Sequence, residues 1–137
     1  MNLGYFSYPL PINEPVLNYG PGSAERTELK NTIEELKNQS VDVPLYIGGK
    51  EVRTGKLHAI RPPHEISRVL GHFHEGDRSH VEEAISAALS AASAWADMNW
   101  ENRAAIFLRA ADLIATKYRY HMLGTTMLGQ GKNVYQA

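Results

Sequence analysis

Cysteine is missing from the 137 residues of this chain. Within these residues the chain can therefore form no disulfide, hold no metal through thiolates and offer no thiol nucleophile. Long apolar runs are missing too, because charged residues or histidine interrupt every apolar segment well before the ~20 residues that a membrane helix needs. The first residues, MNLGYFSYPLPINEP, carry no basic-then-apolar signal and no arginine-rich amphipathic pattern. Together these absences predict a cytoplasmic location without membrane attachment.

An excess of basic charge is also missing, since the formal net charge is −1. Proteins that bind nucleic acid or acidic membranes usually carry a basic surface, so we expect neither partner. Hydrophobic residues make up 43% of the chain and charged residues 21%, the balance of a folded globular protein. The length allows one ordinary domain and no second one.

Residues 1–22 are expected to form an extended arm, because four prolines prevent regular helix there. The aromatic side chains of this arm would be costly to leave in water, so we expect the arm to be docked on a larger surface. The prolines are Pro9, Pro11, Pro15 and Pro21, and the aromatic residues are Tyr5, Phe6, Tyr8 and Tyr19.

Residues 23–37 have the spacing of an amphipathic helix that begins at Ser23. The stretch VPLYIGGKEVRTG then predicts a hairpin, because Gly48 and Gly49 tolerate the positive φ angles of a two-residue turn. Residues 57–61 and 68–74, separated by two prolines, predict two more strands.

Two long helices should follow. Asp77 or Ser79 is expected to cap the first, with Ser79 to Glu82 matching a capping box, and Asn99 is expected to cap the second. Apolar residues at helical spacing predict a buried stripe on each helix. The stripes are Val81, Ile85, Ala88, Ala92 and Trp95 on the first helix, and Phe107, Ala110, Ala111, Ile114 and Tyr118 on the second.

A third helix is predicted over residues 119–128, ending at Gly129. Asn133 then resembles a new N-cap, so that residues 134–137 would form only the first turn of another helix. A single first turn is unstable because nucleation fixes several residues for one hydrogen bond. From this pattern we expect the sequence to be a piece of a longer protein.

The closing segment Gly129-Gln130-Gly131-Lys132 invites comparison with a phosphate-binding loop. Such a loop needs a glycine at position 126 and a hydroxyl after the lysine, and it follows a strand. Thr126 and Asn133 occupy these positions, and the segment follows a predicted helix. A helix C-cap glycine and a tight turn are the preferred interpretation.

No other pattern indicates catalysis. His72 and His74 share one face of a predicted strand, with His64 and His80 nearby in sequence, but no HExxH or cysteine supports a metal site. No GxSxG elbow accompanies the serines at positions 67, 79, 86, 90 and 93. The residues taken alone therefore predict no catalytic, cofactor-binding or metal-binding position.

Residues 43–137 resemble the N-terminal part of the aldehyde dehydrogenase superfamily. The resemblance lies in ordered features: the glycine-turn hairpin, the turn before VLG, DRSHVEEAISAA, WADMNWENRAAIFLRAADLI and a closing GK. The segments PLYIGG, EVRTG and MLGQGK, with the preceding PGS helix, look most like the 1-pyrroline-5-carboxylate (glutamate semialdehyde) dehydrogenase branch. The similarity extends over about residues 15–137.

The resemblance implies an α/β fold of the aldehyde dehydrogenase type, with an arm at 1–22 and the N-terminal part of an NAD-binding domain at 23–137. It also implies a cysteine nucleophile, NAD and a general-base glutamate, all of them outside this chain, so no functional residue is transferred to it. Lys132 matches the closing GK at a helix junction and not the lysine that meets the cofactor. The implied partners are the rest of its own polypeptide and further copies of itself.

Three hypotheses follow. The chain is an inactive structural part of an NAD-dependent enzyme that oxidises glutamate semialdehyde in proline catabolism, or of another aldehyde dehydrogenase. Alternatively, it is a free-standing interaction module of the same fold. In the third hypothesis, it is an unrelated helical protein that binds a nucleotide through the GQGK turn.

Overall fold

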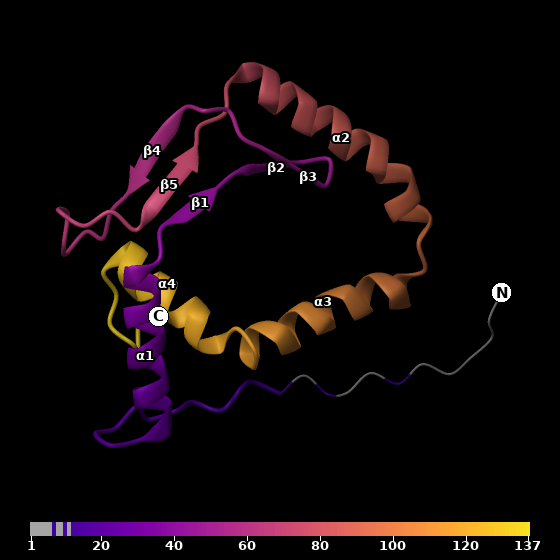
Figure 1. Ribbon diagram of the computed structural model, residues 1–137. Helices are drawn as coiled ribbons and strands as arrows, with labels where there is room; N and C mark the ends of the chain where they lie inside the picture. The colour runs from indigo at the N-terminus through magenta and orange to yellow at the C-terminus, as the bar shows by residue number, and fades with distance from the viewer. Residues whose placement is uncertain (1–6, 8–9, 11) are drawn as a thin grey trace.

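The computed structural model describes residues 7, 10 and 12–137. The described part has an α/β fold in which a small sheet and a hairpin follow the first helix along the chain and three helices come after them, the last of which packs against the first (Figure 1). The elements in chain order are α1 Ala24–Asn38, β1 Val41–Val43, β2 Leu45–Ile47, β3 Lys50–Val52, β4 Leu57–Ile60, β5 Gly71–His74, α2 Arg78–Asp97, α3 Trp100–Ala115 and α4 Arg119–Gln130.

Helix α1 begins where the sequence predicts. The Ser23 side chain accepts a hydrogen bond from the Arg26 N–H at 3.3 Å, which satisfies one of the four donors that a helix N-terminus leaves free. Leu29 and Leu36 are buried, and the charged residues of the helix lie outward. The predicted amphipathic helix is confirmed and extends one residue further, to Asn38.

The hairpin also follows its local chemistry. Gly48 and Gly49 have φ angles of 58° and 78°, the conformation that a two-residue turn of this type requires. Strands β2 and β3 pair antiparallel on either side of them, with Leu45 opposite Val52. The prediction from the Gly-Gly pair is confirmed.

The other three strands form a mixed sheet in the order β1-β5-β4. β5 pairs antiparallel with β4 and parallel with β1. The predicted strands at 57–61 and 68–74 are present but shorter, and Pro62 between them is fully buried. The parallel pairing brings Val41 against Gly71 so closely that a Cβ at Gly71 would lie 2.0 Å from the Val41 carbonyl oxygen. Only glycine fits at this position.

The core lies between the sheet, α1 and α4. Leu36, Leu70 and Leu128 are buried against one another, with Ile33 and Ile60 partly buried beside them. Gly124 lets the two helices approach, since a Cβ there would lie 2.8 Å from a Leu36 methyl carbon. The core therefore joins residues that are about ninety positions apart in the sequence.

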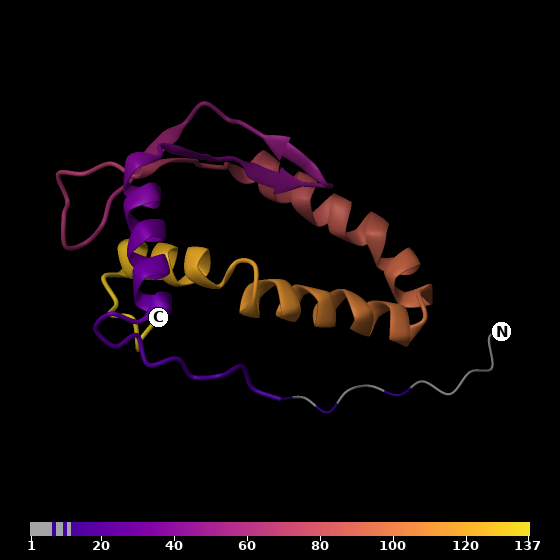
Figure 2. The same cartoon turned by 60° about the horizontal axis from the view of Figure 1, so that its bottom comes forward.

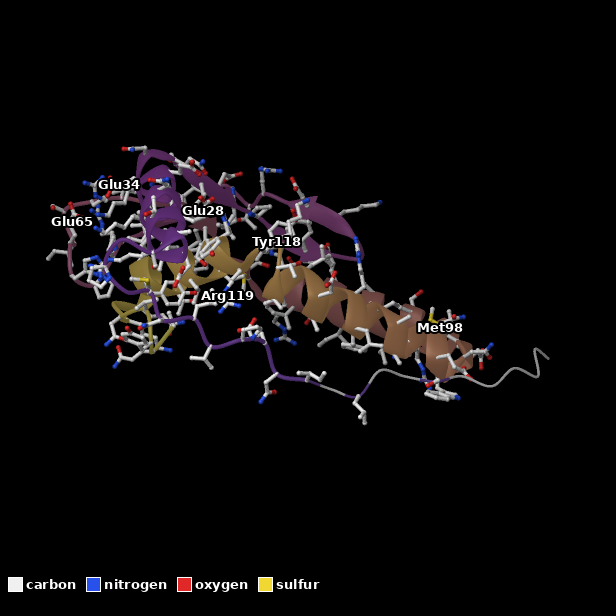
Figure 3. All side chains as sticks on the ribbon, turned by 90° about the horizontal axis from the view of Figure 1, so that it is seen from below. Glu28, Glu34, Glu65, Met98, Tyr118 and Arg119 are labelled. Atoms are coloured by element: carbon white, nitrogen blue, oxygen red, sulfur yellow. The ribbon has the colours of Figure 1, made fainter. Side chains whose placement is uncertain are left out.

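Helices α2 and α3 extend away from this core and meet at a corner near Met98 (Figures 2 and 3). Asp77 caps α2, accepting hydrogen bonds from the N–H groups of Ser79 and His80, while the His80 ring accepts from the Asp77 N–H. The predicted Ser79 to Glu82 capping box is wrong, because Asp77 lies two residues earlier and completes the box with His80. Asn99 occupies the N-cap position of α3 but its side chain makes no capping hydrogen bond.

The predicted buried stripes on these helices are also wrong, since neither α2 nor α3 has a buried residue. Ile85 and Leu89 are 54% and 71% exposed, and Phe107 is 67% exposed. The helical period is present, but the neighbours of these faces leave them largely exposed: the hairpin lies beside α2, the edge of Phe107 meets Trp95, and α4 lies beside Ile114 at the end of α3.

The last helix, α4, ends two residues later than predicted. Gly131, with φ of 65° and ψ of 25°, is the left-handed cap, and Gly129 lies inside the helix. After it, the Asn133 side chain accepts from the Gln136 N–H and its carbonyl accepts from the Ala137 N–H, both at 3.0 Å. The predicted capped turn at 133–137 is therefore formed.

Candidate functional site

The histidines that suggested a metal are not gathered. His74 is buried on β5 and bonded to the β1 side of the sheet, whereas His80 belongs to the α2 cap. His64 lies in the β4–β5 connection beside Gly131. Among residues 7, 10 and 12–137, no group of three or more histidine, aspartate or glutamate side chains is arranged to hold a metal ion.

The GQGK segment has the geometry of a helix end and not of a phosphate loop. Gly131 and Lys132 line a hollow of about 320 Å³ together with Lys37 and His64. This hollow lies at the C-terminus of α4, where the helix dipole places about half a negative charge. Such an end repels phosphate and attracts cations, and Lys37 and Lys132 lie beside it. The C-cap interpretation is confirmed, at Gly131.

A network of charged side chains ties the hairpin to the mixed sheet. Arg53 donates to Asp42 at 2.7 Å and to Glu51 at 2.6 Å, and the Tyr46 hydroxyl donates to Glu51 at 2.7 Å. The Arg53 guanidinium is the main cause that lowers the pKa of Asp42. Hydrogen bonds from Tyr46 and then from Arg53 lower the pKa of Glu51, and the same contact raises the pKa of Tyr46.

The buried side chain of His74, only 5% exposed, holds the Asp42 end of this network. Its Nδ1 accepts from the Gly55 N–H at 3.1 Å, so in the neutral ring Nε2 carries the proton and donates to Asp42 at 3.0 Å. The orientation of the ring is thereby fixed between a backbone turn and a carboxylate. The arrangement has the form of a His-Asp pair, but no serine or other nucleophile among the described residues is bonded to it. Its role in the structure is to hold the hairpin.

A second carboxylate, Glu75, lies at the end of β5. It accepts from Lys56 at 2.7 Å and contacts the His58 ring, which stacks on Phe73 with 5.3 Å between centroids. The hydrogen bonds from Lys56 and then from His58 lower the pKa of Glu75. These side chains are 39% to 66% exposed, and ion pairs open to solvent contribute little to stability.

The N-terminal arm is fastened by Arg119, at the start of α4 and labelled in Figure 3. Its guanidinium donates to the Tyr19 hydroxyl at 3.3 Å, to the Glu14 carboxylate at 3.2 Å and to the Pro15 carbonyl at 3.2 Å. The bond to Tyr19 is the main cause that raises the pKa of Arg119. Tyr19 is buried, as predicted for a docked arm, but Leu10, Ile12 and Val16 are 84% to 97% exposed, so the described arm is docked only near Tyr19. The predicted contacts of Tyr5, Phe6 and Tyr8 lie outside the described residues.

An apolar surface is exposed on α2 and α3 in the described part of the chain. Beside α2, the hairpin leaves a hollow of about 460 Å³ lined by Leu45, Val81 and Ile85. On α3, three consecutive apolar residues, Ile106, Phe107 and Leu108, are 47% to 67% exposed. A helix that is apolar on more than one side is typical of the interior of a larger body. These helices are suited to contact further protein.

No helix in the described part of the chain is both long enough and apolar enough to cross a membrane. The exposed apolar residues of α2 and α3 are interspersed with charged ones such as Glu82, Arg103 and Arg109.

The chain is similar in sequence to known proteins that are much longer than it is. Residues 49–137 match the aldehyde dehydrogenase family. The chain is 48% identical over 136 residues to a delta-1-pyrroline-5-carboxylate dehydrogenase of Agaricus bisporus, covering 98% of this chain and 25% of that protein. It is 41% identical over 129 residues to a delta-1-pyrroline-5-carboxylate dehydrogenase, mitochondrial, of Dictyostelium discoideum, covering 94% and 23%.

Among solved structures, the delta-pyrroline-5-carboxylate dehydrogenase of Mycobacterium tuberculosis bound with NAD matches with a TM-score of 0.92 and 39% identity. That match covers 98% of this chain and 25% of the other. The chain thus spans about a quarter of the length of the relatives that it matches.

Proposed function

The chain belongs to the aldehyde dehydrogenase family, and on that premise we propose that it is the N-terminal part of an NAD-dependent oxidoreductase. The proposed reaction oxidises glutamate semialdehyde, the open form of 1-pyrroline-5-carboxylate, to glutamate in proline catabolism. The observation that carries the proposal is the likeness to delta-1-pyrroline-5-carboxylate dehydrogenases over nearly all of the chain. This likeness extends over the hairpin and over the arm that Arg119 fastens, and not only over residues 49–137, which match the family model.

In this proposal the 137 residues are structural and inactive by themselves. Covalent aldehyde oxidation needs a nucleophile that adds to the carbonyl carbon, and in the family that the chain resembles this nucleophile is a cysteine. The chain has none. Its contribution is to hold the hairpin and the sheet in register and to offer the apolar surface of α2 and α3 to the remainder of the enzyme.

NAD belongs to the proposal through the relatives, one of which was solved bound with it. The GQGK segment does not fit the pyrophosphate of this cofactor. The one glycine motif that suggested a phosphate cradle lies at the negative end of α4, where a pyrophosphate would be repelled. We therefore assign NAD binding to other parts of the enzyme and derive no step of it from this chain.

The other expectations are part of the same proposal. The exposed faces of α2 and α3 support contacts with the rest of the polypeptide or with further copies of the chain, as in a homo-oligomer. The proposed location is cytoplasmic. Several relatives are named mitochondrial, so localisation of a tagged protein in its own cell decides between the two compartments.

The alternative is a free-standing interaction module of the same fold, and the apolar surface on α2 and α3 also favours it. In that case the chain would bind a dehydrogenase subunit and have no chemistry of its own. A third possibility is that the chain is part of an NAD-dependent aldehyde dehydrogenase whose substrate is another aldehyde.

The test is an assay of NADH formation by the protein expressed from its own gene, with glutamate semialdehyde and with two unrelated aldehydes. Residues 1–137 alone serve as the matched sample. The proposal expects NADH with glutamate semialdehyde in the first sample and none in the second. If the protein prefers an unrelated aldehyde, the proposed substrate is wrong. If it is inactive but binds a dehydrogenase subunit, the interaction module is favoured. If residues 1–137 alone are active, the proposed structural role is overturned.

A further inference from the structure

The arm and the segment after α4 are fastened at one place. Tyr19 is buried although its backbone has a φ of 52°. A non-glycine residue is disfavoured in this left-handed region, so its surroundings must impose the conformation. The contacts that do so come from three directions.

The first contacts come from the helices. Arg119 of α4 reaches the Tyr19 hydroxyl, and Arg26 of α1 donates to the Tyr19 carbonyl at 3.4 Å. The Arg119 side chain is only 15% exposed and uses three donors on the arm. A lysine at this position could not reproduce that planar fork.

The remaining contact comes from the end of the described chain. The Tyr135 hydroxyl donates to the Asn18 carbonyl at 2.9 Å, across 117 positions of sequence. Tyr135 stands in the turn formed by Asn133 and Ala137. Beneath this bond, Tyr19, Leu29, Val134 and Tyr135 line a hollow of about 250 Å³ between the arm, α1 and the turn. The segment from Glu14 to Gly20 therefore lies as a strap over both helices and the turn.

We propose that this strap is a conformational device which couples the N-terminal arm to residues 133–137. Docking of the arm orders the turn after α4, and order in that turn holds the arm. Because such coupling is a free energy shared by two sites, its effect must be the same in both directions. Through the strap, the conformation of the turn after α4 depends on a segment more than a hundred residues earlier.

The structure supplies a reporter amide at each end. On the arm side, the Ser23 N–H donates to the Gly20 carbonyl, and on the turn side the Gln136 and Ala137 N–H groups donate to Asn133. Hydrogen exchange of these amides is measured in the protein as expressed from its own gene. Two variants are compared with the wild type, Arg119→Lys and Tyr135→Phe. Arg109→Lys on the exposed side of α3 is the matched control.

The expected result is reciprocal. Arg119→Lys should speed exchange at Gln136 and Ala137, and Tyr135→Phe should speed exchange at Ser23, each by about two- to tenfold, the range of one net hydrogen bond. Arg109→Lys should change neither. The proposal is overturned if Arg119→Lys leaves the turn amides unchanged, or if Tyr135→Phe leaves Ser23 unchanged. Tyr135 is 72% exposed, so its variant keeps the fold intact even if Arg119→Lys does not.

Discussion

Replacing Gly71 by alanine tests how β1 is held on the sheet. A Cβ at this position would lie 2.0 Å from the Val41 carbonyl oxygen and 2.7 Å from the Val41 nitrogen. Both atoms belong to the backbone of β1, so no side-chain rotation can relieve the overlap. An ordinary contact needs 3.4 Å or more, and the strand would have to move by more than an ångström.

The cost follows from what that movement breaks. The parallel ladder joins residues 41–43 to 71–73, and the Val41 N–H donates to the Leu70 carbonyl at 3.0 Å. Losing two or three such hydrogen bonds costs about 1 kcal/mol each, and a side chain at a φ of 155° costs a further ~1–3 kcal/mol. We expect a loss of about 3–6 kcal/mol in the free energy of unfolding. This is a large share of the ~5–15 kcal/mol that a domain has.

Equilibrium urea unfolding, followed by circular dichroism, measures this loss. Gly129→Ala is the matched control, because Gly129 lies inside α4 with open space around its Cβ position. It should stabilise the helix by about 0.5–1 kcal/mol. If Gly71→Ala unfolds within ~0.5 kcal/mol of the wild type, β1 is not held by this close approach and the reasoning fails.

Two further predictions concern the charged network and the long helices. Arg53 lowers the pKa of Asp42 below its ordinary 3.8, and a lowered carboxylate pKa gives stability that is present above the unfolded value and lost as pH falls through the folded one. As the pH falls from about 5 to about 2, the free energy of unfolding of Arg53→Gln should therefore decrease less than that of the wild type, as measured by urea titrations. Parallel curves of unfolding free energy against pH for the two proteins would contradict this. Arg109→Gln is the control. Since α2 and α3 bury no residue, their amides should exchange with solvent faster than those of α1 and α4 in residues 1–137 expressed alone. Equal protection in a mass-spectrometric exchange experiment would show that these helices are held by something else.

The sequence predicted the elements whose causes are local. Gly48 and Gly49 specify their turn within two residues, and Ser23 caps α1 three residues before its donor. The α2 cap was predicted only in part, because Asp77 was named but its partner His80 was not. A histidine at that place in a capping box is outside the usual pattern of glutamate or glutamine.

What the sequence could not supply were contacts between distant positions. The parallel pairing of β1 with β5 and the bonds from Arg119 to the arm join residues 30 and 100 positions apart, and no periodicity encodes such pairs. The apolar stripes on α2 and α3 also show that the sequence does not predict contacts between distant segments. A period of 3.6 indicates which face is apolar, whereas burial depends on whether a neighbour lies against it.

The placement of Leu36 and Leu128 in one core has a consequence for synthesis on the ribosome. The two residues are 92 positions apart. At about 5–20 residues per second, roughly 5–18 s pass between their translation. During that interval the apolar side of α1 has no α4 to cover it, and we expect it to be open to a holding chaperone until α4 has left the ribosome.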